Sequence, residues 1–342
     1  MADSTSDARP SLLQRASQNT LLLLIVLCGV QFVDAFDVSS MGPALPEIGR
    51  DLGISPDTLQ WVVTGYVLGY GGFLLLGGRL ADLFDARRLL LGALAIFIVA
   101  SVIGGLAQSG ELLIGARIAK GITAAFTAPA ALALLLRMYS DEGERHKALG
   151  AYLTVSSVGF TAGLVLGGIL AAGTWRLVML VPAGFALLLL IAGALLIPKS
   201  PPAIGARDRV DLVGAVSVTT GLLALVYGVS RTASEGWGDG LTIAALVVAV
   251  GLLATFVLVE RARRAPLVPL GIFAKPGVAR GNATIFLLQG AYVGWQFIAT
   301  LYLQEVNDWT PVEVGLVFAP GGLFVLFTAN LWARLAAQHG PW

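Results

Sequence analysis

Long apolar runs separated by short polar segments are the feature that most constrains this chain. Ten runs of about 20 residues are present, and an α-helix of that length crosses the hydrocarbon core of a membrane. The runs are continuous and rich in Leu, Ala and Gly, without the alternating pattern of a membrane β-barrel. The sequence therefore predicts an all-α polytopic membrane protein with spans at about 20–42, 58–78, 88–107, 112–136, 148–171, 177–197, 212–230, 241–259, 281–304 and 312–334.

Composition agrees with this prediction and excludes several classes of protein. Of the 342 residues, 56% are hydrophobic and 13% are charged, whereas about a quarter of the residues in a soluble domain are charged. So few charges cannot cover a water-soluble particle, which excludes a soluble globular enzyme and a disordered chain. The formal net charge of +1 provides no field that attracts a polyanion, which excludes a nucleic-acid binder.

Basic residues are distributed unevenly between alternate loops. If the N-terminus is cytoplasmic, the cytoplasmic segments hold 17 Lys and Arg residues and the outer segments hold three, namely Arg50, Arg176 and Arg231. Positively charged loops stay in the cytoplasm, so this distribution predicts a cytoplasmic N-terminus in a multi-pass protein of the plasma membrane. The first 19 residues are polar and no cleavage site follows the first span, which predicts an uncleaved signal anchor.

Two polar linkers and one short sequence repeat indicate how the chain is organised. The triplet at 79–81 recurs at 334–336, each time after the second span of a segment, which suggests two homologous halves. The second half then has two of six expected spans, so a C-terminally truncated chain is expected. The predicted divisions are a cytoplasmic tail (1–19), a six-span half (20–197), a linker (198–211), two additional spans (212–259), a second linker (260–280) and the start of an incomplete second half (281–342).

Four ionisable residues fall inside predicted spans, where a charge is costly and indicates function. Asp34 and Asp37 lie three residues apart in the first span, and Arg117 and Lys120 have the same spacing in the fourth. The two spans run in opposite directions, and the depths match in two acid–base pairs: Asp37 with Arg117, and Asp34 with Lys120. We interpret the four as a proton-coupling site, because moving a cation relative to a buried carboxylate loads or releases a proton. The alternative is a static ion pair that joins two helices.

Glycines recur at every fourth residue of the fifth span, at Gly159, Gly163 and Gly167, with Gly168 beside the last. Such a row of glycines lets another helix approach closely. The prediction is a contact at which helices slide or rock during function. The alternative is tight packing without movement, since the chain has 42 glycines and chance spacings are common.

The loop after the second span mixes acidic and basic residues between positions 77 and 88. An acidic residue at a cytoplasmic helix end can form a salt bridge in one conformation and lose it in another, so the loop is interpreted as a gate formed by Gly78, Asp82, Arg87 and Arg88. The alternative is a topology signal with a solvated turn.

Signatures of other chemistry are missing from the sequence. There is no phosphate-binding loop for ATP, one cysteine (Cys28) and two separate histidines (His146 and His339). The sequence therefore predicts no enzyme, no ATP hydrolysis, and no metal or cofactor. The expected partners are a small-molecule substrate, protons and the lipid bilayer, without nucleic acid.

Several motifs occur in a fixed order along the chain. They are Asp37 with 44–46 in the first span, 60–66 in the second, 78–88 in the loop, Arg117, Gly121 and 124–129 in the fourth, Gly163 with 167–168 in the fifth, and 235–238 with 302–304. In this order the motifs resemble those of the major facilitator superfamily, and of its fourteen-span drug:proton antiporter (multidrug efflux) branch in particular. The resemblance extends over nearly the whole chain from about residue 20.

The resemblance implies a helical bundle of two six-span halves with two additional spans between them. It also implies alternating access driven by protons, with export of amphiphilic or cationic compounds such as antibiotics. It makes Arg117 the coupling cation, Asp37 its acidic partner, and Gly78, Asp82 and Arg88 the gating loop.

The sequence departs from the family pattern at several positions. Asp85 stands where the family favours glycine, and Leu164 stands where proline is usual in the fifth span. Lys120 and Asp34 are both unusual, and they are interpreted as a compensating pair. Because four family spans are missing, the alternatives to a proton-coupled exporter are a truncated remnant that transports nothing and an uncoupled facilitator of a metabolite.

Overall fold

Helices dominate the structure because a backbone in lipid must satisfy its hydrogen bonds within its own segment. The computed structural model describes residues 12–139, 141–198, 212–263, 268, 270–321, 324 and 328. No strand occurs in these ranges. The elements are α1 (Leu12–Leu52), α2 (Pro56–Leu83), α3 (Ala86–Gly105), α4 (Gly110–Met138), α5 (Glu142–Gly173), α6 (Arg176–Leu196), α7 (Leu212–Glu235), α8 (Gly240–Ala262), the 3-10 helix η1 (Leu270–Ala274), α9 (Pro276–Leu301) and the π-helix η2 (Tyr302–Val306).

The predicted all-α membrane fold is confirmed. Nine helices in the described part of the chain are long and apolar enough to cross a membrane, and a shorter helix, Pro311–Gly321, begins the tenth predicted span. The largest difference from a predicted boundary is at the end of α1, which continues ten residues beyond its predicted end at position 42. The predicted span ends just before Pro43, but Pro43 and Pro46 both lie inside α1. Transmembrane helices tolerate proline where neighbouring groups satisfy the freed carbonyls.

Some predicted features lie partly or wholly outside the described residues. These are the tail 1–19, of which only the last eight residues are described, most of the linker 198–211, part of the linker 260–280, the second triplet at 334–336, and His339.

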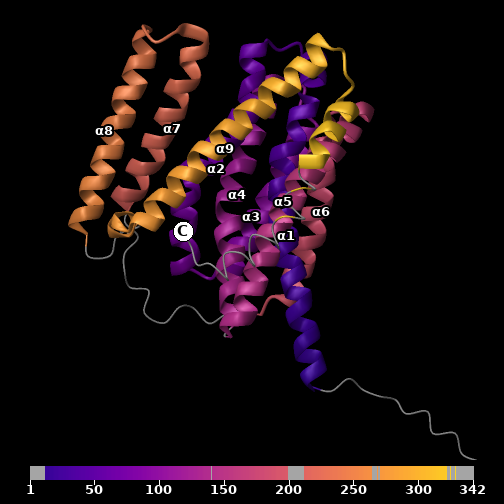
Figure 1. Cartoon of the computed structure of the whole chain (residues 1–342), viewed down its shortest axis with the longest axis vertical. Helices are drawn as coiled ribbons and strands as arrows, with labels where there is room; N and C mark the ends of the chain where they lie inside the picture. The colour runs from indigo at the N-terminus through magenta and orange to yellow at the C-terminus, as the bar shows by residue number, and fades with distance from the viewer. Residues whose placement is uncertain are drawn as a thin grey trace, which may run out of the picture.

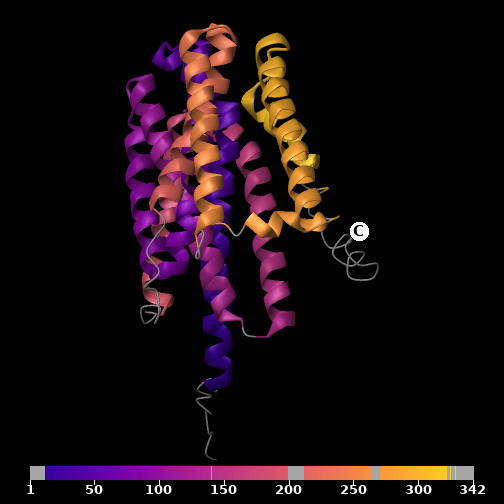
Figure 2. The same cartoon turned by 90° about the vertical axis from the view of Figure 1, so that its left-hand side faces the viewer.

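Successive helices alternate in direction, so the described helix ends that flank the predicted cytoplasmic loops after α2, α4, α6 and α8 lie at one end of the bundle, the lower end in Figure 1. Helices α1–α6 form one bundle, and α9 crosses one face of it diagonally (Figures 1 and 2). The hairpin of α7 and α8 stands beside this bundle. It meets α2, where the rings of Trp61 and Tyr227 lie 6.0 Å apart and Leu223 packs on Gly72.

The core of the six-helix bundle consists of two hydrophobic clusters at different heights. The inner cluster, toward the predicted cytoplasmic end, includes Leu27, Leu90 and Phe97. The outer cluster includes Leu45 and Trp175. Charged residues of α1 and α4 lie between the two clusters. Hydrophobic side chains therefore separate these charges from both ends of the bundle.

Short polar side chains fix where several helices begin. Each accepts a hydrogen bond from a backbone N–H in the first turn of its helix, which satisfies a donor that the helix itself leaves free. They are Ser55 for α2, Asp85 for α3, Ser109 for α4, Asp141 for α5 and Asp239 for α8. The cap at Asp85 gives a physical reason for one departure from the family pattern, since glycine there would lack the capping carboxylate.

Replacing Asp239 by asparagine is expected to loosen the turn between α7 and α8. Hydrogen bonds from Arg231, at 2.9 Å, and from Thr242 lower the pKa of Asp239 from 3.8 to about 2. A carboxyl group with a lowered pKa stabilises the folded state above its unfolded pKa, and the contribution is lost as the pH falls through the folded value. Hydrogen exchange of the turn should therefore be faster in Asp239→Asn at neutral pH. The difference should shrink from about pH 4 toward pH 2, and a difference independent of pH would contradict the prediction.

Candidate functional site

A cluster of buried charges lies where α1 and α4 meet, between the two hydrophobic clusters. It consists of Asp34 and Asp37 from α1 and of Arg117 and Lys120 from α4. All four side chains are buried, and the formal charges sum to zero when every group is ionised. Moving an unpaired charge from water into the interior costs roughly several kcal/mol or more. The bundle can therefore hold these four groups only when they neutralise one another.

Asp37 accepts hydrogen bonds from both cations. Nη1 of Arg117 donates to Oδ2 of Asp37 at 2.6 Å, and Nζ of Lys120 donates to Oδ1 of the same carboxylate. The predicted pair of Asp37 and Arg117 is therefore confirmed as a contact. Arg117 is also fixed by the carbonyl oxygen of Val62 at 3.0 Å, which belongs to α2.

Aromatic faces hold the two cations from the other side. The guanidinium of Arg117 lies 4.7 Å from the ring centroid of Tyr66, and Nζ of Lys120 lies 4.5 Å from that of Phe97. Such contacts stabilise a cation in a dry environment. Helices α2 and α3 thus take part in the site, which the spacing of charges in the sequence did not indicate.

The predicted pair of Asp34 and Lys120 was wrong. Lys120 bonds to Asp37, whereas Oδ2 of Asp34 accepts a hydrogen bond from Oγ1 of Thr127 at 2.7 Å. Long cationic side chains can reach one carboxylate from two different turns of α4, so matched depths did not decide the partner. The distance of Asp37 from the outer end of its helix was also underestimated, because α1 extends to Leu52.

A second set of polar groups lies one turn of α1 nearer the predicted cytoplasmic end. Oε1 of Gln31 accepts a hydrogen bond from the hydroxyl of Tyr152 at 2.7 Å, and Nε2 of Gln31 donates to Ser156 at 3.0 Å. Sequence reasoning missed this group. The signal was the spacing of Gln31, Asp34 and Asp37, which recur every third residue along α1.

The glycine row of α5 packs directly against α1, whereas the sequence predicted the close approach of a helix without indicating which one. A Cβ atom on Gly159 would lie 2.6 Å from the carbonyl oxygen of Phe32, and one on Gly167 would lie 2.6 Å from Cα of Ser40. Gly163 faces Phe36 and Ser39 at similarly short range. Gly168 instead faces Pro311, at the start of the short helix. Any side chain in this row would push two backbones apart.

A second glycine contact joins α2 to α4, and the sequence analysis missed it. Gly77 lies against the carbonyl of Ala125, Gly69 against Ile118, and Gly121 against the carbonyl of Tyr66. Because the chain is rich in glycine, Gly69 and Gly77 did not stand out as contact positions, and Gly121 was recognised only as part of a motif. They bring the helix of Arg117 and Lys120 close to α2.

The residues of the predicted gating loop have different surroundings in the structure. Nη2 of Arg87 donates to the carbonyl oxygen of Ala194 at 2.7 Å, which ties the loop to the end of α6. Arg88 lies 3.6 Å from Asp85, and its side chain is largely exposed. Asp82 is exposed and is in no ion pair within the described part of the chain. A Cβ on Gly78 would meet open space, whereas Gly77 beside it is tightly packed.

Three residues form a polar clamp at the outer end of the bundle. Oδ2 of Asp51 accepts hydrogen bonds from Nε1 of Trp175 at 2.8 Å and from Nη1 of Arg176 at 2.6 Å. Arg176 also donates to the carbonyl of Ala107 at 3.1 Å. The clamp joins α1, the turn between α3 and α4, and the turn between α5 and α6. The sequence placed Arg176 in an outer segment but gave no prediction of its partner.

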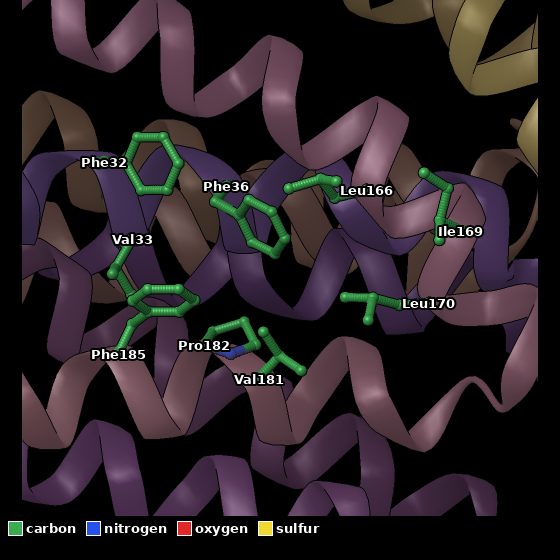
Figure 3. A pocket seen from close by; sticks show the side chains of 9 residues that line it. All are labelled: Phe32, Val33, Phe36, Leu166, Ile169, Leu170, Val181, Pro182 and Phe185. Carbon is green, nitrogen blue, oxygen red and sulfur yellow. The ribbon is translucent and has the colours of Figure 1, made fainter.

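An apolar cavity of about 150 Å³ lies among α1, α5 and α6 (Figure 3). No residue of the charged cluster lines it, although Phe36 precedes Asp37 in the sequence. Its lining side chains are all hydrophobic, so the cavity suits a hydrocarbon group. They are Phe32, Val33, Phe36, Leu166, Ile169, Leu170, Val181, Pro182 and Phe185.

Comparison with known proteins finds one family and many relatives. The model described as Major Facilitator Superfamily matches residues 27–342. The cephamycin export protein CmcT of Amycolatopsis lactamdurans is 41% identical over 309 residues, which cover 89% of this chain and 63% of that protein. The puromycin resistance protein pur8 of Streptomyces alboniger is 40% identical over 320 residues, covering 93% of this chain and 63% of that protein. The chain thus spans less than two thirds of the length of these two relatives.

A solved structure shares the fold at low sequence identity. Tetrameric PepTSo2 superimposes with a TM-score of 0.61 at 14% identity, covering 93% of this chain and 71% of that chain. This likeness concerns the arrangement of the helices alone.

Proposed function

The chain belongs to the Major Facilitator Superfamily, and from this premise we propose that it exports amphiphilic or cationic small molecules in exchange for protons. Membership makes it a multi-pass transporter of the plasma membrane rather than an enzyme. Relatives named for cephamycin export and for puromycin resistance support efflux of small organic molecules. The hairpin of α7 and α8 follows the six-helix bundle and precedes α9 in the sequence, which supports membership of the fourteen-span branch.

The buried charged cluster is the observation that carries this proposal. Ionisable groups within a membrane are rare and mark proton or ion pathways. Here Asp34, Asp37, Arg117 and Lys120 meet in a closed layer, where one proton more or less changes the net charge of the interior. Such a change biases the protein between conformations that expose the cluster to opposite sides.

The glycine contacts and the loop support the conformational part of the proposal. Helices that touch through glycines present smooth surfaces, and α5 touches both α1 and the short helix Pro311–Gly321 in this way. We assign Gly78, Asp82, Arg87 and Arg88 to a cytoplasmic gate. Arg87 holds the end of α6 in this conformation, and Asp82 is exposed toward solvent.

Efflux of a lipophilic cation should depend on the proton gradient. We expect proteoliposomes that contain the intact protein to transport ethidium against its gradient when a pH difference is imposed, and to stop when nigericin collapses that difference. The measurement is ethidium fluorescence, with empty liposomes as the control. Ethidium movement only down its own gradient, unchanged by nigericin, would favour an uncoupled facilitator, and no transport of any amphiphilic cation or cephamycin-like compound would contradict the proposal.

A further inference from the structure

The two carboxylates of the cluster have different kinds of partner. Asp37 receives charge-assisted hydrogen bonds from Arg117 and Lys120, one on each oxygen atom, and it is fully buried. Both carboxylate oxygens of Asp37 are thus occupied by cationic donors, which makes this carboxylate the shared counter-ion of Arg117 and Lys120. Protonating Asp37 would break these bonds and leave two buried cations without a counter-ion.

Asp34 has no cation within ion-pair distance among the described residues. Its bonded partner is the neutral hydroxyl of Thr127, which can donate to a carboxylate and can accept from a carboxylic acid. Asp34 therefore keeps a hydrogen bond in either protonation state. The other ionisable groups that interact with it electrostatically are Asp37 on α1, Tyr66 and Tyr70 on α2, Lys120 on α4 and Tyr152 on α5.

The net charge of the cluster depends on whether Asp34 is ionised or protonated. Arg117, Lys120 and ionised Asp37 together carry one excess positive charge. Ionised Asp34 cancels this charge and permits a dry, closed interior, whereas protonated Asp34 leaves the charge uncompensated between two hydrophobic clusters. Lys120, which the family pattern lacks, adds a second buried cation. A second acidic residue is therefore required to keep the cluster neutral.

We propose that Asp34 is the carboxyl group that takes up and releases the exchanged proton, while Asp37 serves as the fixed counter-ion of Arg117 and Lys120. This assignment rests on the proposed function and names the proton carrier within it. One proton adds to a carboxylate oxygen of Asp34 on one side of the membrane and leaves from it on the other. A bound cationic substrate favours ionised Asp34, so substrate and proton compete, as antiport requires.

Infrared difference spectra of the purified protein at two pH values test the assignment without a substrate. The carbonyl stretch of a buried, protonated carboxyl group should appear as the pH is lowered. We expect the band to be lost in Asp34→Asn and kept in Asp57→Asn, a matched change of an exposed acid. In Thr127→Val the band should appear at a pH about one unit higher, because the hydrogen bond to the ionised carboxylate is charge-assisted and its loss outweighs the loss of the weaker bond to the neutral acid.

A band that persists in Asp34→Asn, or that is absent from the wild-type protein, would overturn the assignment. If Asp34→Asn does not fold, Thr127→Val decides, because an unshifted band rejects Asp34 as its source. Failure of the proposed function has a different signature. In that case the band behaves as expected, but nigericin does not affect efflux.

Discussion

Replacing Asp37 by asparagine should destabilise the protein by about 3–5 kcal/mol, the usual cost of leaving a buried ion without its partner. Two cations lose their shared counter-ion at once, since Arg117 and Lys120 both donate to this carboxylate. Neither cation can reach water, because both side chains are buried between hydrophobic clusters. Thermal unfolding of the purified protein in detergent measures the change, and efflux should be lost with it.

The double variant Asp37→Asn with Lys120→Gln separates charge from shape. It restores the neutral sum of the cluster, since Arg117 and Asp34 then balance each other. We expect it to be more stable than Asp37→Asn alone, although one residue more has been changed. The control is Asp57→Asn, which removes an exposed carboxylate from the first turn of α2. Equal damage in the single and double variants would show that the cations do not depend on Asp37.

Local patterns predicted much of this structure from the sequence. Apolar run lengths predicted the helices, and charges inside the spans identified all four members of the cluster. Asp37 and Arg117 could be paired because both lie in spans that must bury their charge. The partner of Lys120 could not be predicted, because the reach of a long side chain and the crossing of α1 and α4 decide it. Only the packed bundle shows that Thr127 is the partner of Asp34.

Contacts made by single residues across the bundle were beyond sequence reasoning. The outer clamp joins Asp51 to Trp175, which are 124 positions apart in the chain. Gly121 was quoted as part of a motif, but its contact with the carbonyl of Tyr66 follows only from the approach of α2 to α4. The end of α1 was missed for a local reason, since Pro43 usually stops a helix in water and is tolerated here.

Replacing Gly163 by alanine should destabilise the contact of α1 with α5 and abolish efflux. Its new Cβ would lie 2.5 Å from the carbonyl oxygen of Phe36 and 3.0 Å from Cα of the same residue, and it would also meet Oγ of Ser39. The hydroxyl of Ser39 can rotate, but the backbone of Phe36 cannot move without shifting the neighbouring Asp37. Overpacking of this kind costs about 1–3 kcal/mol, and it exceeds the gain in helix propensity from glycine to alanine.

Gly150 gives a matched control on the same helix, because a Cβ there meets no atom within 4 Å. Gly150→Ala should be neutral or more stable by up to about 1 kcal/mol, since alanine favours the helix. Thermal unfolding and proton-driven ethidium efflux should both separate the two variants. If Gly163→Ala is as stable and as active as Gly150→Ala, the close approach of α1 and α5 is not needed for function. Loss of efflux with stability retained would instead place the requirement in the movement of α5 against α1.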